Sequence, residues 1–227
     1  MSVFGEKVSI LIHGDCEEYM RTTDLSDCVI VTDPPFNIGY HYKSYKDRIP
    51  EKEYYDWLSR VFRNAEDCPV VCVMYPEMLY RLSAVMGKFP ERVISWVYPS
   101  NTRRQHRDIA FFGVKPDFSK VNQPYRNPND KRIKTLIASG KTGANSYDWF
   151  EVNQVKNVSF QKTSHPCQMP EEVMRKVVGL LPDGLTVIDP FMGSGTTGVA
   201  CKELGHKFVG IELDKEYFDI ASRRLDE

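Results

Sequence analysis

Short runs of apolar residues recur along the chain and are separated by stretches in which apolar positions repeat every three or four residues. The runs are rich in Val, Ile and aromatic residues and mostly lack polar alternation, which is typical of strands buried on both faces of a sheet. They are Val8–Ile12, Cys28–Thr32, Val70–Met74, Val93–Tyr98, Ile109–Gly113, Thr186–Asp189 and Lys207–Ile211.

The stretches between these runs have the periodicity of amphipathic helices. Pro170, followed by two glutamates, is a typical helix start, because proline fits the first turn and carboxylates favour the positive end of the helix dipole. The predicted helices are Cys16–Arg21, Glu51–Asn64, Glu77–Phe89, Pro170–Leu181, Thr196–Leu204 and Lys215–Leu225. Regular alternation of strand and helix predicts an α/β fold with a doubly wound, mainly parallel sheet of seven strands.

Two stretches break this alternation. Residues 114–160 contain several prolines, asparagines and glycines with little periodicity, which predicts a loop-rich insertion or a partly disordered segment. Residues 34–50 are also unperiodic but rich in aromatic side chains. A chain of 227 residues therefore predicts one domain, residues 1–227, with a small insertion at about 114–160.

Composition narrows the class of protein. Apolar residues make up 41% of the chain and charged residues 27%, as in an ordinary soluble globular protein. No apolar stretch approaches the roughly 20 residues of a membrane span, and the N-terminus has no apolar signal core. Six cysteines are scattered without tetrahedral zinc spacing. We therefore expect a cytoplasmic protein with reduced thiols and no metal.

The net charge of −1 hides a basic middle section. Residues 99–165 carry 12 basic and 5 acidic side chains, a net charge of +7, whereas residues 1–98 and 166–227 each carry −4. Such an asymmetry suggests a local surface for a polyanion. A solvated loop with a chance excess of Lys and Arg explains the same numbers.

A glycine-rich segment follows the strand predicted at Thr186–Asp189 and opens the next helix. Gly193, Gly195 and Gly198 have the spacing G-x-G-x-x-G, with which a tight turn brings backbone N–H groups against an anionic or polar cofactor. The next strand ends in Glu212, 19 positions after the first glycine, near where a ribose-binding carboxylate lies in nucleotide-binding folds. The segment predicts a nucleoside cofactor; glycines that only form a turn are the alternative.

The acid before this turn helps to distinguish between cofactors. Asp189 precedes the glycines, where its charge would repel a pyrophosphate and attract a cation. S-adenosylmethionine carries a ribose, an adenine, an ammonium and a sulfonium, so it suits a turn flanked by carboxylates better than NAD does. Methyl transfer is the leading hypothesis, and hydride transfer is the weaker one.

A second segment, Asp33-Pro34-Pro35-Phe36, follows the strand predicted at Cys28–Thr32. The prolines fix the backbone, so the Asp33 carboxylate and the Pro34 carbonyl can together accept both hydrogens of an exocyclic amine. The amine lone pair then becomes available to an electrophilic methyl group, and the Phe36 ring offers a face for base stacking. A Pro-Pro turn with a helix-capping Asp is the alternative interpretation.

Together these segments resemble the amino-methylating DNA methyltransferases of the circularly permuted β group, in which the target motif precedes the cofactor loop. Asp33-Pro34-Pro35-Phe36 resembles the family's Asp-Pro-Pro-Tyr motif, with Phe36 in place of Tyr. The segment from His165 to Pro170 is similar to the family's His-Pro-x-Gln-Lys-Pro, with Met169 in place of Lys. The resemblance covers residues 8–113 and 160–225 and implies a Rossmann-like methyltransferase fold.

The resemblance also implies the residues of the site. The catalytic residues would be Asp33, Pro34, Pro35 and Phe36. The residues that bind S-adenosylmethionine would be Asp15, Cys16, Asp33, His165, Asp189, Pro190, Phe191, Gly193, Ser194, Gly195, Thr196, Thr197 and Glu212. The implied reaction is direct methyl transfer to the N6 amine of adenine in DNA, with the base flipped out of the duplex. N4-cytosine, an RNA amine, or a non-catalytic nucleotide- or DNA-binding protein are the alternatives.

Contacts with DNA phosphates are expected from the basic middle section. The candidates are Arg103, Arg104, Arg107, Lys131, Arg132 and Lys134, although each could instead lie on a solvated surface, and Arg107 could pair with Asp108 or another nearby acid. Tyr40, Tyr42 and Tyr45 could line the base pocket or could simply pack. A homodimer, a cognate restriction nuclease and a prokaryotic or phage origin are compatible with the resemblance.

Overall fold

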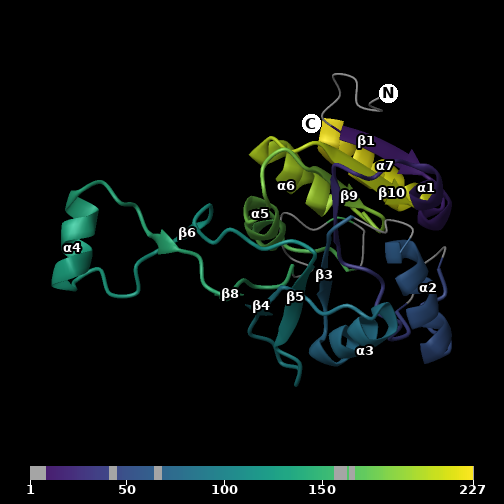
Figure 1. Ribbon diagram of the computed structural model, residues 1–227, viewed down its shortest axis with the longest axis horizontal. Helices are drawn as coiled ribbons and strands as arrows, with labels where there is room; N and C mark the ends of the chain where they lie inside the picture. Colours follow the sequence, from purple (N-terminus) through teal and green to yellow (C-terminus); the bar gives the residue numbers. More distant parts are fainter. Residues whose placement is uncertain (1–8, 41–44, 64–67, 156–162, 164–166, 227) are drawn as a thin grey trace.

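The computed structural model describes residues 9–40, 45–63, 68–155, 163 and 167–226, and one sheet of eight strands forms its centre (Figure 1). The strands of this sheet are β1 (Ser9–His13), β2 (Cys28–Thr32), β3 (Val70–Met74), β4 (Arg92–Val97), β5 (His106–Phe112), β8 (Trp149–Glu151), β9 (Thr186–Asp189) and β10 (Phe208–Glu212). Their spatial order is β1-β10-β9-β2-β3-β5-β4-β8. The first five strands of this spatial order, which are β1, β10, β9, β2 and β3, pair in parallel. Strand β5 is antiparallel to both of its neighbours, β3 and β4.

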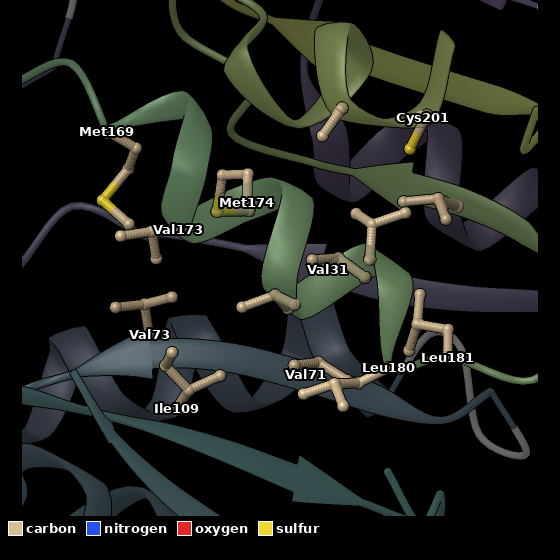
Figure 2. Packing of buried hydrophobic residues seen from close by; sticks show 14 of the residues in the cluster. Val31, Val71, Val73, Ile109, Met169, Val173, Met174, Leu180, Leu181 and Cys201 are labelled. Atoms are coloured by element: carbon tan, nitrogen blue, oxygen red, sulfur yellow. The ribbon is translucent and has the colours of Figure 1, made fainter. Parts of the chain in front are cut away.

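Helices cover both faces of the sheet. On one face lie α1 (Cys16–Thr22), α2 (Glu51–Arg63) and α3 (Pro76–Met86), and on the other lie α5 (Glu171–Gly179), α6 (Thr196–Leu204) and α7 (Lys215–Asp226). Strand β2 contributes to both layers, because Val29 and Val31 pack towards α5 whereas Ile30 packs towards α1 to α3. Figure 2 shows the layer on the α5 side of the sheet, where Val173 and Met174 of α5 lie over Val31 and Val73.

The sheet confirms the predicted doubly wound, mainly parallel architecture. Every residue of β2, β3 and β9 is buried, as expected for strands covered on both faces. The predicted number of seven strands is wrong by one, because β8 pairs in parallel with β4 at the edge of the sheet. This strand has only three residues, and it lies in the unperiodic part of the sequence.

The stretch from residue 114 onward contains further regular structure that its sequence pattern did not predict. Strands β6 (Asn122–Gln123) and β7 (Ala144–Asn145) form a small antiparallel sheet, and between them lies α4 (Lys131–Ala138). We call residues 122–145 the arm, because α4 lies well away from the rest of the protein (Figure 1). No residue of α4 is buried. In the part of the chain that the structure describes, no helix is long and apolar enough to cross a membrane.

Candidate active site

The carboxyl ends of β2 and β9 lie side by side. The two strands pair in parallel, with Cys28 opposite Thr186, so they end at the same edge of the sheet. Across that edge, Oγ1 of Thr32 donates a hydrogen bond of 2.7 Å to Oδ1 of Asp189. Asp33 and Asp189 both line one cavity of about 220 Å³. The proximity that the predicted transfer requires is therefore present.

The cavity brings together most of the residues predicted to bind the cofactor. Of that set, its lining contains Asp15, Cys16, Asp33, Asp189, Pro190, Phe191, Gly193, Ser194, Thr196, Thr197 and Glu212. Gly195 belongs to the same turn but is not part of the lining, and His165 lies outside the residues that the structure describes. Of the predicted catalytic segment, Asp33 and Pro35 line the cavity.

Asp189 organises the turn as well as facing the cavity. Its Oδ1 accepts hydrogen bonds from Thr32 and from the backbone N–H of Phe191 (3.1 Å), and its Oδ2 accepts one from Oγ1 of Thr197 (2.6 Å). Burial raises the pKa of Asp189 to about 6, and these hydrogen bonds oppose that rise because they stabilise the charged form. The carboxylate thus connects β2, the turn and the first residues of α6.

The glycines of the turn are required by its backbone and by its packing. Gly193 has a φ of +51° and Gly195 a φ of +78°, in the left-handed region that L-amino acids with a Cβ rarely adopt. A Cβ on Gly198 would lie 2.6 Å from the ring of Phe208. The first two glycines therefore shape the turn, and the third allows α6 to pack closely against β10.

Two further acids stand at neighbouring strand ends. Oε2 of Glu212 accepts a hydrogen bond of 2.9 Å from the backbone of Gly193, and Oε1 accepts one of 2.8 Å from the backbone of Asp214. Burial raises the pKa of Glu212, and these bonds oppose the rise. Asp15 caps α1 by accepting a hydrogen bond of 2.7 Å from the backbone of Glu17. Both acids are thereby held in fixed orientations at the cavity.

Asp33 lies at the junction between this cavity and a second cluster of side chains. Its carboxylate oxygen Oδ2 is 3.7 Å from Nη1 of Arg107, and 17% of its side chain is exposed. Burial raises the pKa of Asp33 to about 7, with a further contribution from the charge of Asp189, whereas the charge of Arg107 lowers it. Among the described residues, the other oxygen, Oδ1, has no hydrogen-bond partner.

The residues after Asp33 are fixed by contacts from several elements. Oη of Tyr54 in α2 donates a hydrogen bond of 2.7 Å to the carbonyl of Pro35. The ring of Phe36 lies 5.2 Å from that of Tyr75, between centroids. Beyond Phe36, the buried carboxylate of Asp47 accepts hydrogen bonds from three backbone N–H groups, including that of Asn37 at 2.7 Å. The segment Asp33-Pro34-Pro35-Phe36 is thus held in place by contacts with several elements.

Comparison with known proteins finds one family whose model covers both the Asp33 segment and the glycine-rich turn. A family model described as DNA methylase, N6_N4_Mtase, matches residues 28–223, which include both the Asp33 segment and the glycine turn. The chain belongs to this family.

Individual relatives agree with this assignment. The methylase is 28% identical over 222 residues to the type II methyltransferase M.HpaI of Haemophilus parainfluenzae, an alignment that covers 87% of this chain and 68% of the relative. It is 25% identical over 255 residues to the DNA adenine methyltransferase YhdJ of Escherichia coli strain K12, covering 98% of this chain and 84% of that protein. The crystal structure of the M1.HpyAVI–SAM complex superposes with a TM-score of 0.64 at 25% identity, covering 96% and 100% of the two chains.

Several residues that shape the site of the methylase were not found from the sequence. Trp57 of α2 and Tyr217 of α7 line the cavity, and the ring of Trp57 lies 5.4 Å from that of Phe191. The sequence left open whether Tyr45 lines a pocket or only packs against other residues. In the structure it lines the cavity and stacks on Trp57. Residue 42 lies outside the described residues, and Tyr40 is 38% exposed. Trp57 and Tyr217 lie within ordinary amphipathic helices, so no local signal separates them from core residues.

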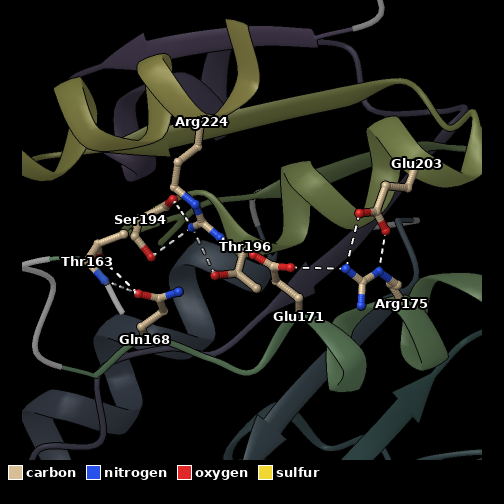
Figure 3. A network of polar contacts seen from close by, with 8 residues as sticks. All are labelled: Thr163, Gln168, Glu171, Arg175, Ser194, Thr196, Glu203 and Arg224. Atoms are coloured by element: carbon tan, nitrogen blue, oxygen red, sulfur yellow. Dashed lines mark hydrogen bonds and ion pairs between the residues drawn. The ribbon is translucent and has the colours of Figure 1, made fainter. Parts of the chain in front are cut away.

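Arg224 of α7 is another residue of the site that was not found from the sequence. Its guanidinium donates hydrogen bonds to the carbonyl and Oγ of Ser194 and to Oγ1 of Thr196, and it pairs with Glu171 at 2.8 Å (Figure 3). Glu171 is shared with Arg175 of α5. Helix α7 therefore holds the glycine-rich turn in place through Arg224.

The residues predicted to contact DNA fall into three places. Lys131, Arg132 and Lys134 are exposed on α4 in the arm, and Arg103 is exposed in the loop before β5. Arg104 pairs with Glu77 at the surface and lies over the ring of Tyr75.

Arg107 differs from these residues, because it faces the interior of the methylase. Only 14% of its side chain is exposed, and it meets Asp33 rather than Asp108. The prediction of a phosphate contact for Arg107 does not fit this position, since neighbouring residues of a strand point to opposite faces and residue 107 points inward.

Proposed function

We propose that this protein transfers a methyl group from S-adenosylmethionine to the N6 amine of adenine in DNA. The observation that carries the proposal is the common cavity of Asp33 and Asp189, whose strand ends are joined by the Thr32–Asp189 hydrogen bond. On one side of this cavity lies the glycine-rich turn, to which we assign the nucleoside cofactor. On the other side lies the Asp33 carboxylate, to which we assign the amine hydrogens. Membership of the DNA methylase family supports the same reaction.

The side chains of the cavity suit S-adenosylmethionine chemically. Glu212 keeps lone pairs beyond its two backbone hydrogen bonds, so we assign it the ribose hydroxyls. The carboxylates of Asp189 and Asp15 favour a ligand with a positive charge over one with a pyrophosphate. Gly193 lines the cavity and has no Cβ, so a ligand can approach the backbone of the turn closely. We assign the remaining predicted cofactor residues, including His165, to the same ligand.

When bound, S-adenosylmethionine supplies a methyl group activated by a sulfonium, so no strong base is needed for its transfer. The chain's part is to position and polarise the amine. We assign Oδ1 of Asp33 as an acceptor for one amine hydrogen, because it is buried and has no other partner among the described residues. We assign the Pro34 carbonyl as the second acceptor and the Phe36 ring as the stacking surface. The amine proton then leaves through Asp33 or to water.

The arm is the proposed target-recognition insertion, together with the loop before β5. The three cations on α4 are exposed, and their helix makes little contact with the rest of the protein (Figure 1). Arg103 and Arg104 lie beside the Asp33 end of the sheet, near β5. Cations at these two places could contact the duplex phosphates on either side of a flipped base.

The setting of the reaction is also proposed by analogy with bacterial relatives. M.HpaI is named as a type II methyltransferase, which supports a cytoplasmic restriction-modification role with a cognate nuclease. A homodimer is the proposed assembly. Sedimentation of the purified protein tests this last point, since a monomer with full activity would exclude a required dimer.

Mass analysis of nucleosides tests the function. The protein is incubated with mixed-sequence DNA and, in a parallel reaction, with mixed-sequence RNA, each with isotope-labelled S-adenosylmethionine, and the nucleic acid is digested to nucleosides. We expect labelled N6-methyl-2′-deoxyadenosine from DNA. Labelled N4-methyl-2′-deoxycytidine, or label in RNA alone, would replace the proposal by the corresponding alternative. Binding of S-adenosylmethionine without any label transfer would favour a non-catalytic binding protein, and tighter binding of NAD would overturn the choice of cofactor.

A further inference from the structure

We propose that Arg107 is a positioning residue for methyl transfer: it holds one oxygen of Asp33 and the ring of Phe36 in place, so that the other oxygen of Asp33 is presented to the amine. The inference rests on the proposed function, because it assigns a role in the same reaction. It concerns a residue whose sequence context suggested a different role, a contact with DNA phosphate.

The topology of the sheet brings Arg107 to this position. Strand β5 runs antiparallel to β3, so the beginning of β5 lies at the edge where β2 and β3 end. Arg107 is the second residue of β5 and lies opposite Trp96 of β4. Asp33 follows β2, and only β3 separates β2 from β5. A long side chain on β5 can therefore reach across the end of β3 to Asp33.

The guanidinium of Arg107 is enclosed by aromatic rings. Its central carbon lies 4.8 Å from the centroid of the Phe36 ring, 5.3 Å from that of Trp96 and 5.4 Å from that of Tyr75. Such contacts favour a planar, permanently charged group over an ammonium. Because Phe36 is the proposed stacking surface for the target base, the same guanidinium touches both functional residues of the segment.

The contact with Asp33 is an ion pair without a hydrogen bond. Nη1 of Arg107 is 3.7 Å from Oδ2 of Asp33, which is beyond hydrogen-bonding distance. Among the described residues, neither Nε of Arg107 nor Oδ1 of Asp33 has a hydrogen-bond partner, although both atoms are buried. Buried polar atoms are costly to leave unpaired. An acceptor held in this state is suited to a donor that arrives with the substrate.

The charges around this pair indicate which groups titrate near neutral pH. Three titratable side chains lie around Asp33: Arg107 of β5, Asp189 at the end of β9 and Cys72 of β3. Around Arg107 lie Asp33, Tyr75 and Tyr98. Burial raises the pKa of Cys72 to about 12 and that of Tyr98 above its ordinary value, so both stay neutral. Between about pH 5 and 9, Asp33 and Asp189 are the members of this group that change charge, and Arg107 favours the ionised form of Asp33.

Replacing Arg107 by Met separates positioning from packing. Met keeps an apolar side chain among the three rings but removes the charge that favours the Asp33 carboxylate. An opposite charge at this distance shifts a carboxyl pKa by about 1–3 units. We therefore expect the acidic limb of the pH profile of kcat to move to higher pH by about 1–3 units. At neutral pH, kcat should fall about fivefold or more, in step with the ionised fraction of Asp33, while the KM for S-adenosylmethionine stays unchanged. In Arg107→Lys, which keeps a positive charge, the shift of the acidic limb and the fall in kcat should both be smaller than in Arg107→Met.

The control is Arg81→Met, which removes an exposed arginine of α3 that pairs with Glu51; its pH profile should match that of the wild type. An unmoved limb in Arg107→Met, whatever its kcat, would overturn the proposal and leave Arg107 a packing residue. A rise in kcat/KM for DNA would also overturn it, because Arg107 would then occupy the place of the target base.

A titration independent of activity distinguishes this proposal from the function on which it rests. Carboxyl carbons of Asp are labelled with ¹³C, the signal of Asp33 is assigned with Asp33→Asn, and its pKa is measured in the wild type and in Arg107→Met. A higher pKa in the variant supports the role of Arg107 even if the wild type methylates a different base. Equal pKa values would overturn it even if N6-methyladenine is formed in DNA.

Discussion

Substituting Gly195 by Ala perturbs the glycine-rich turn where it packs against α7. Gly195 has a φ of +78°, and a Cβ at this position would lie 3.0 Å from Cβ and 3.2 Å from Cα of Ala221 in α7. The left-handed conformation costs an alanine about 1–2 kcal/mol. Relief of the contact requires a shift of backbone, because Ala221 has no flexible side chain to rotate away. Overpacking of this kind adds about 1–3 kcal/mol.

We expect Gly195→Ala to lower the free energy of unfolding by about 2–5 kcal/mol and to weaken S-adenosylmethionine binding at least tenfold, or by about 1.4 kcal/mol. Denaturant unfolding measures the first quantity, and isothermal titration measures the second. The reason for the second effect is that displacement of residue 195 also moves Gly193 and Ser194, which line the cavity.

Gly205→Ala is the matched control at the other end of α6. Gly205 has a φ of +74°, but nothing lies within 4 Å of the position of its Cβ. This variant should lose about 1–2 kcal/mol of stability from the backbone alone and bind S-adenosylmethionine as the wild type does. Equal losses of affinity in the two variants, or an unchanged affinity in Gly195→Ala, would refute the assignment of the turn.

Three other predictions test separate parts of the structure. Arg224→Met should weaken S-adenosylmethionine binding several-fold in isothermal titration, whereas Arg175→Met, in the same network but without contact with the turn, should not; equal effects would argue against fastening by α7. Asp33→Asn should gain stability relative to the wild type as pH rises from about 4 to 7, because the pKa of Asp33 is raised in the folded state and its ionisation then opposes folding; urea unfolding across this range checks the sign, and a constant difference would contradict it. Replacing the three cations of α4 by Gln should reduce the slope of log K for DNA against log salt by about 2.7, with S-adenosylmethionine affinity as the control; an unchanged slope would remove the arm from the DNA interface.

The parts of the fold that were predictable are those with strong local signals. Strands β2, β3 and β9 and helix α6 have the predicted bounds, because a proline or glycine follows each element within two residues. The chemistry could be located for the same reason: Asp33, Asp189 and Glu212 each stand at the end of such a strand or directly after it. In a parallel sheet, strand ends of this kind converge at one edge.

The parts that were missed depend on contacts between distant segments. Arg107 meets Asp33 because β5 turns back antiparallel to β3, and the local sequence does not reveal that direction. Arg224 reaches Ser194 from a helix 30 residues later. Helix α4 was missed although Ile133, Leu136 and Ile137 have the helical spacing i, i+3 and i+4, because the prolines and glycines around it predicted a loop. Its cap was readable, since Asp130 accepts hydrogen bonds from the backbone N–H groups of Arg132 and Ile133.

The most direct test of the account is a single-turnover experiment with Asp33→Ala, in which enzyme saturated with labelled S-adenosylmethionine is mixed with excess DNA. The account predicts that this variant still binds S-adenosylmethionine but transfers no measurable label to adenine, since the amine has lost its acceptor. Label transfer at a rate near that of the wild type would contradict the account, because the amine would then be activated without Asp33.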